Sequence, residues 1–175
     1  FVAFIGLWFC RKILLRYFDD QSTALGLLVL AFATNYLNYS AIDGAMTHNF
    51  LFTLYALLIW LTIRWYEKPT LKISTAVGAI IGLATITRPV ELISVLIPLL
   101  WGLNGFSDLP QRLTFWQSHW QKIVAAMLTT IAVGTIQLVY WKWYSGDWLF
   151  YSYEDQGFDW KSPHLEAIFS YRKGW

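Results

Sequence analysis

Charged residues are scarce in this sequence. Asp, Glu, Lys and Arg make up 14% of it, whereas soluble domains contain about 25%. The net charge of +2 is too small to indicate nucleic-acid binding, so we expect no nucleic-acid partner. The single cysteine, Cys10, excludes an internal disulfide and a cysteine-based metal site. His48, His119 and His164 lack the spacing of a metal motif.

The motifs of nucleotide chemistry are also missing. The sequence contains no GxxxxGK[ST] loop, no GxGxxG turn and no GxSxG elbow. A lipid-borne substrate is the natural alternative for an enzyme in a bilayer. The sequence begins at Phe1, without Met, inside an apolar run, and shows no readable signal peptide. We therefore expect an internal part of a longer protein, with some catalytic residues outside it.

Apolar and aromatic residues are abundant instead. They form 57% and 19% of the 175 residues, more than a single aqueous core of this size can bury. A membrane-spanning helix needs roughly 20 apolar residues. The sequence therefore predicts an all-α fold, a polytopic transmembrane helical bundle of about six spanning or partly spanning helices, with 1–175 forming part of one transmembrane domain. The apolar runs are 1–9, 23–39, 50–66, 73–87, 90–103 and 123–141.

Two polar segments outside these runs have their own pattern. Segment 104–121 carries Leu109, Leu113, Trp116 and Trp120 at helical spacing, which predicts a helix lying in the membrane surface. Segment 142–175 is polar and rich in aromatic residues, and we expect an aromatic loop at the outer face.

Basic residues predict the orientation of the bundle. Eight basic residues lie in one set of loops and five in the opposite set. The set with more basic residues is expected to be cytoplasmic. This puts 104–121 inside, and puts 40–49, the Arg88-Pro89 break and 142–175 outside. The richer set comprises Arg11, Lys12, Arg16, Arg64, Lys68, Lys72, Arg112 and Lys122, and the other set Arg88, Lys142, Lys161, Arg172 and Lys173.

A first candidate site follows the second apolar run. Asn35 and Asn38 are three residues apart, and Asp43 and His48 come shortly after. Polar groups within lipid are costly unless they face protein or a wet cavity. One interpretation is a polar cleft on the outer face, in which Asp43 binds an acceptor or a metal and His48 lies nearby. The alternative is a solvated loop with interhelical hydrogen bonds.

Three basic residues are candidates for binding phosphate. Arg88 interrupts a long apolar region, and its permanently charged guanidinium suits phosphate. Glu91, three residues later, could instead neutralise it. Arg172 and Lys173 are adjacent in the predicted outer loop. This pair could bind the phosphate of a lipid substrate, or any anionic headgroup of the membrane.

Gly78 and Gly82 form a pair of small residues that lets helices approach closely. They belong to the run from Gly78 to Pro89, which follows the polar turn 43–48 and precedes the aromatic loop. In this arrangement the sequence resembles bacterial GT-C fold membrane glycosyltransferases of the family 39 type, which are related to protein O-mannosyltransferases and to the aminoarabinose transferases of lipid A. The ending 169–175, FSYRKGW, resembles a segment found in a bacterial subset of these proteins.

The resemblance implies an enzyme of the bacterial inner membrane, with its active face outward. Such an enzyme transfers a sugar from a polyprenyl-phosphate donor to a lipid, protein or glycan acceptor. Its catalytic base would lie upstream of this chain, Asp43 would be the second acidic residue, and His48 a further candidate. Arg88, Arg172 and Lys173 would stabilise charge on the departing phosphate. Some relatives use a divalent metal, and nothing in the sequence decides whether this chain does.

Two other functions remain open at this point. A transporter or flippase subunit also needs polar groups and broken helices. A ligase or polymerase of lipid-linked glycans would share the substrate class and differ in acceptor. The polar residues gather near one predicted surface, which favours an enzyme at that surface over a transporter.

Overall fold

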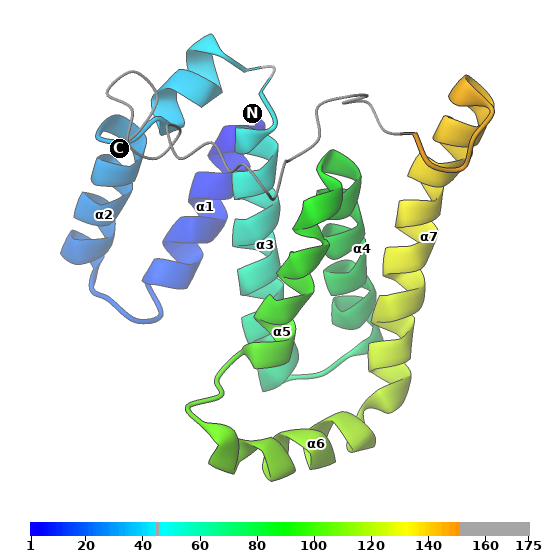
Figure 1. Cartoon of the computed structure of the whole chain (residues 1–175). Coiled ribbons are helices and arrows are strands. Elements are labelled where there is room, and N and C mark those ends of the chain that lie inside the picture. Colours follow the sequence, from blue (N-terminus) through cyan, green and yellow to red (C-terminus); the bar gives the residue numbers. More distant parts are fainter. Residues whose placement is uncertain (45, 151–175) are drawn as a thin grey trace, which may run out of the picture. The chain divides into compact units, whose positions relative to one another are not determined.

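The computed structural model describes residues 1–44 and 46–150, and every regular element among them is a helix (Figure 1). The prediction of an all-helical fold is thereby confirmed. The chain divides into two compact units, 1–137 and 138–175. Within the described residues, two helices are long and apolar enough to cross a membrane, α3 (His48–Glu67) and α7 (Trp120–Ser145). The predicted number of about six spanning helices therefore stays a prediction.

The first unit begins with three helices that run alternately up and down, α1 (Val2–Leu14), α2 (Asp20–Phe32) and α3 (Figure 1). α1 and α3 are consequently parallel, and their contacts keep one register along their whole length. The Thr53 hydroxyl donates to the Val2 carbonyl at 3.0 Å, the rings of Phe9 and Trp60 lie 6.3 Å apart, and Arg16 forms an ion pair with Glu67.

α4 (Leu71–Thr87) returns antiparallel to α3, and Leu58, Val77 and Ile81 form the buried core between them. The helix ends at Arg88, whose backbone is extended because a residue that precedes proline avoids the helical conformation. The 3₁₀ helix η2 (Pro89–Val95) and α5 (Leu96–Leu100) then follow. The predicted break at Arg88-Pro89 is therefore present, and it opens a short irregular helix.

A short 3₁₀ turn, η3 (Phe106–Asp108), leads into α6 (Leu109–Ser118), which lies across the lower end of the helices in Figure 1. This confirms a helix within 104–121. α7 then begins at Trp120 and continues to Ser145, so it is longer at both ends than the apolar run 123–141. Its extension covers the first residues of the predicted loop 142–175.

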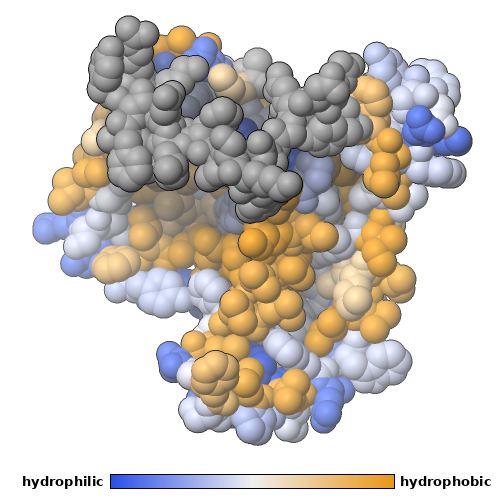
Figure 2. Space-filling view, in the orientation of Figure 1, coloured by the Kyte–Doolittle hydropathy of each residue, from blue (hydrophilic) through white to orange (hydrophobic). Residues whose placement is uncertain are grey.

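Many large apolar side chains are exposed, and several polar side chains are buried beside the apolar core. The only buried residue of α2 is Thr23, while its Leu25 and Phe32 are 64% and 71% exposed. Figure 2 shows a broad apolar area over the part of the molecule that α5 occupies in Figure 1. Soluble monomers rarely expose such continuous apolar surface. Among the residues that the structure describes, six buried ones are polar: Thr23, Asn49, Thr53, Thr62, Ser74 and Ser94.

Candidate functional site

A hollow of about 380 Å³ lies between the segment that follows α2 and the start of α3. Asn49 fixes its wall, because its side-chain nitrogen donates to the Tyr39 carbonyl at 2.6 Å and its oxygen accepts from the Ser40 hydroxyl at 3.1 Å. The rings of Tyr39 and His48 lie 4.5 Å apart. The hollow thus combines polar and aromatic groups. Its lining residues are Leu30, Thr34, Asn35, Tyr36, Tyr39, His48, Asn49 and Phe52.

Asp43 lies beside this hollow and is not part of its lining. It follows the π-helical turn η1 (Asn38–Ile42), is exposed, and accepts a hydrogen bond from the Asn38 side-chain nitrogen at 2.9 Å. The structure therefore brings Asn35 and His48 into one hollow and leaves Asp43 at its side. No three His, Cys, Asp or Glu side chains within 1–44 and 46–150 are placed to hold a metal ion.

Arg88 lies at the same end of the first unit, where α4 ends, and it is half-buried. It does not line the hollow. Within the described residues it forms no ion pair with Glu91. Glu91 instead accepts a hydrogen bond from the Tyr55 hydroxyl. Tyr55 follows His48 by seven residues, or about 10 Å along the helix axis, so the contact between Tyr55 and Glu91 lies about two helical turns from the start of α3.

The remaining candidates have different outcomes. Arg172, Lys173 and His164 lie outside the described residues. His119 lies at the other end of the unit, where Nδ1 is 2.9 Å from the Phe115 carbonyl and the ring is 4.6 Å from that of Phe115. The sequence predicts an interface residue at His119 and not a metal ligand, and this prediction is not tested by the aromatic contact.

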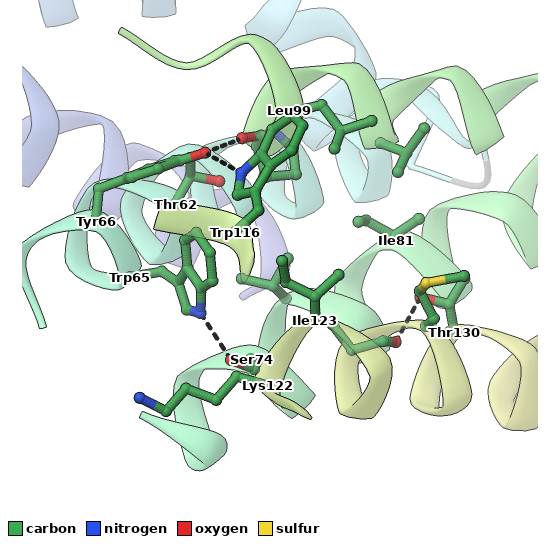
Figure 3. A pocket seen from close by; sticks show the side chains of 15 residues that line it. Thr62, Trp65, Tyr66, Ser74, Ile81, Leu99, Trp116, Lys122, Ile123 and Thr130 are labelled. Atoms are coloured by element: carbon green, nitrogen blue, oxygen red, sulfur yellow. Dashed lines mark hydrogen bonds between the residues drawn. The ribbon is translucent and has the colours of Figure 1, made fainter. Parts of the chain in front are cut away.

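A second cavity, of about 280 Å³, was not predicted from the sequence (Figure 3). It lies among α3, α4, α5 and the first turns of α7. The sequence feature that could have indicated this cavity is a set of small residues spaced four apart. Such residues keep two helices close where they touch and leave space beside the contact. They are Ser74, Gly78 and Gly82 in α4 and Ala126 and Thr130 in α7. The lining residues are Thr62, Trp65, Tyr66, Ser74, Val77, Ile81, Val95, Pro98, Leu99, Trp116, Lys122, Ile123, Ala126, Met127 and Thr130.

Comparison of the chain with protein-family models, with curated proteins and with solved structures finds no match. The resemblance to GT-C glycosyltransferases therefore stays a prediction, and so do the substrate, the acceptor and the cellular location that it implies.

Proposed function

We propose that this chain is part of a membrane-embedded, GT-C-like glycosyltransferase of the bacterial inner membrane. It transfers a sugar from a polyprenyl-phosphate donor at the end of the bundle that carries His48 and Arg88. The observation that carries the proposal is the gathering of the hollow, Asp43 and Arg88 at that end of the first unit, while eight other basic residues occupy the opposite end.

The membrane location is supported by how the helices pack. Where lipid is the solvent, the hydrophobic effect does not drive helices together, so small residues and interhelical hydrogen bonds hold them. Gly6 of α1 faces Thr53 of α3, and the Thr130 hydroxyl of α7 donates to the Gly78 carbonyl of α4 at 2.9 Å. Apolar side chains such as Leu28 point outward. Both features are typical of a bundle surrounded by lipid.

The side chains at this end suit the proposed reaction. The acceptor oxygen would form a bond to the anomeric carbon as the bond from that carbon to the phosphate oxygen breaks, and the phosphate would leave with the electron pair. Arg88 would stabilise this developing negative charge. The acceptor hydroxyl must lose its proton, and Asp43 and His48 are the ionisable groups near the hollow that could assist a base from outside the chain.

The proposal is tested with the intact protein in native membranes. Arg88→Ala is expected to lower transfer of sugar from a radiolabelled polyprenyl-phosphate donor by about 100-fold, as expected when one charge-stabilising group is lost. Arg88→Lys should restore part of the rate, because it keeps the charge but loses the planar fork. Lys72→Ala is the matched control, since Lys72 is exposed at the opposite end of the same helix.

Equal rates for Arg88→Ala, Lys72→Ala and the unmodified protein would contradict the assignment of Arg88. Movement of the labelled lipid between leaflets, with no sugar transferred to any acceptor, would favour the transporter or flippase function instead.

A further inference from the structure

The cavity of about 280 Å³ is many times larger than the space that one water molecule needs. Protein interiors contain few voids larger than a water, and apolar cavities do not retain water. Its walls are formed mainly by apolar side chains, among them Val77, Ile81 and Ile123 (Figure 3). An apolar molecule is therefore the natural occupant.

Thr62 adds a polar requirement inside this cavity. Its side chain is fully buried and its hydroxyl has no hydrogen-bond partner within the described residues. Other helical threonines, such as Thr85 and Thr129, donate to the carbonyl four residues earlier, at 2.8 Å in both cases. A buried hydroxyl without a partner carries a desolvation cost. An occupant that supplies an acceptor to Thr62 would remove this cost.

Lys122 gives the cavity a charged edge. It lines the cavity in the first turn of α7, and in Figure 3 its amine lies at the margin of the group. A cation at a helix N-terminus is disfavoured by the helix dipole, whereas an anion there is favoured. This end of the unit also carries Arg64, Lys68 and Lys72. Negative charge on the occupant would complement Lys122, the basic residue of the cavity lining.

We infer that the cavity binds one anionic phospholipid. Its phosphate pairs with Lys122, an ester carbonyl accepts from Thr62, and an acyl chain lies along Ile81 and Met127. Lys122 and Thr130 are eight residues apart, so the cavity offers about 12 Å of depth along α7. Met127 is 58% exposed, which provides a lateral opening toward lipid. The inference rests on the membrane location proposed above and is independent of the transfer reaction.

The first test measures which lipid the protein retains. The intact protein is reconstituted in vesicles of equal phosphatidylglycerol and phosphatidylcholine, purified in detergent and weighed by native mass spectrometry. We expect one retained phospholipid per chain, enriched in phosphatidylglycerol. Lys122→Gln should lower this enrichment about fivefold, the effect expected of one basic residue near an anionic surface. Lys72→Gln, an exposed lysine at the same end that does not line the cavity, should leave it unchanged.

Two further variants test the interior. Thr62→Val keeps the shape and removes the hydroxyl, so it should reduce retention of both lipids. Ile81→Trp fills the cavity and should abolish retention. Unchanged enrichment in Lys122→Gln, or a retained lipid in a folded Ile81→Trp variant, would overturn the inference.

A measurement on the unmodified protein avoids any dependence on variant folding. Phosphatidylglycerol with a photoactivatable group on its acyl chain is crosslinked to the intact protein, and the modified peptides are mapped. Adducts at Ile81 or Ile123, whose side chains are less exposed than that of Met127, support the site. Adducts confined to the outward side chains of α2, such as Leu28 and Phe32, would show surrounding lipid only and would refute it. Because no sugar transfer is measured, failure here is distinguishable from failure of the proposed enzyme activity.

Discussion

Gly78→Ala tests whether the close approach of α4 and α7 is a packing requirement. A Cβ atom at residue 78 would lie 2.8 Å from the Ala126 carbonyl carbon and 2.9 Å from its Cα atom. These are backbone atoms and cannot rotate aside, so α7 would have to move. Overpacking of this kind costs about 1–3 kcal/mol. The movement would also stretch the hydrogen bond from the Thr130 hydroxyl to the Gly78 carbonyl, 2.9 Å long, which contributes about 0.5–1.5 kcal/mol.

The higher helix propensity of alanine offsets about 1 kcal/mol of this cost. We therefore expect Gly78→Ala to lower the free energy of unfolding by about 2 kcal/mol. Gly134→Ala in α7 is the matched control, because nothing lies within 4 Å of its added Cβ. It should raise the free energy of unfolding by up to about 1 kcal/mol. Reversible unfolding of the intact protein in mixed micelles with increasing SDS, followed by circular dichroism, measures both. Stabilisation by Gly78→Ala equal to that by Gly134→Ala would refute the reasoning.

Two further predictions concern the core and the start of α2. Leu58→Ala should lower the free energy of unfolding by about 2–5 kcal/mol, because Leu58 is 1% exposed and packs against Val77 and Ile81. If Leu58→Ala lowers the free energy of unfolding no more than Leu28→Ala at an exposed position, the assigned core is contradicted. The Asp19 carboxylate accepts from the Ser22 backbone N–H at 2.7 Å and from its hydroxyl, and these bonds lower the pKa of Asp19. A lowered pKa in the folded state adds stability that is present above the unfolded pKa, near 4, and is lost as the pH falls through the folded value. Amide exchange at the start of α2 should therefore accelerate as the pH falls below about 4. Asp19→Asn keeps a capping side chain and should remove this pH dependence. An unchanged pH profile in that variant would show that Asp19 is not the source of the dependence.

The features that local sequence determines were predictable. Proline sets the conformation of the residue before it, so Pro89 reveals where α4 ends. Gly78 and Gly82 are spaced for close helix contact, and a Cβ at Gly82 would lie 2.7 Å from that of Val133 in α7. The amphipathic pattern of 104–121 likewise revealed α6. Each of these signals acts within one or two helical turns, so a single sequence is enough to read it.

Features set by distant partners were not predictable. The second apolar run continues to Tyr39, yet α2 ends at Phe32, and no glycine or proline marks this end. The segment after α2 forms hydrogen bonds to α3 instead of continuing the helix, since Asn49 of α3 binds both Tyr39 and Ser40. The cavity beside Lys122 has the same origin, because its walls come from helices far apart in the sequence.

The partner of Glu91 decides how the candidate site is understood. From the sequence, an ion pair with Arg88 and a free guanidinium were both open, and they have different consequences. An arginine already paired with a carboxylate must exchange that partner for a phosphate, so much of the attraction would be cancelled. Glu91 is held by the Tyr55 hydroxyl, 36 residues away, which turns the carboxylate toward α3. The positive charge of Arg88 is then not neutralised by a direct contact with Glu91.

A half-buried guanidinium in such surroundings gains more from binding an anion than an exposed one, because opposite charges attract more strongly where water is partly excluded. For that reason the Tyr55–Glu91 contact, which no local pattern in the sequence could reveal, makes Arg88 the strongest candidate among the described residues for binding the phosphate of the proposed sugar donor.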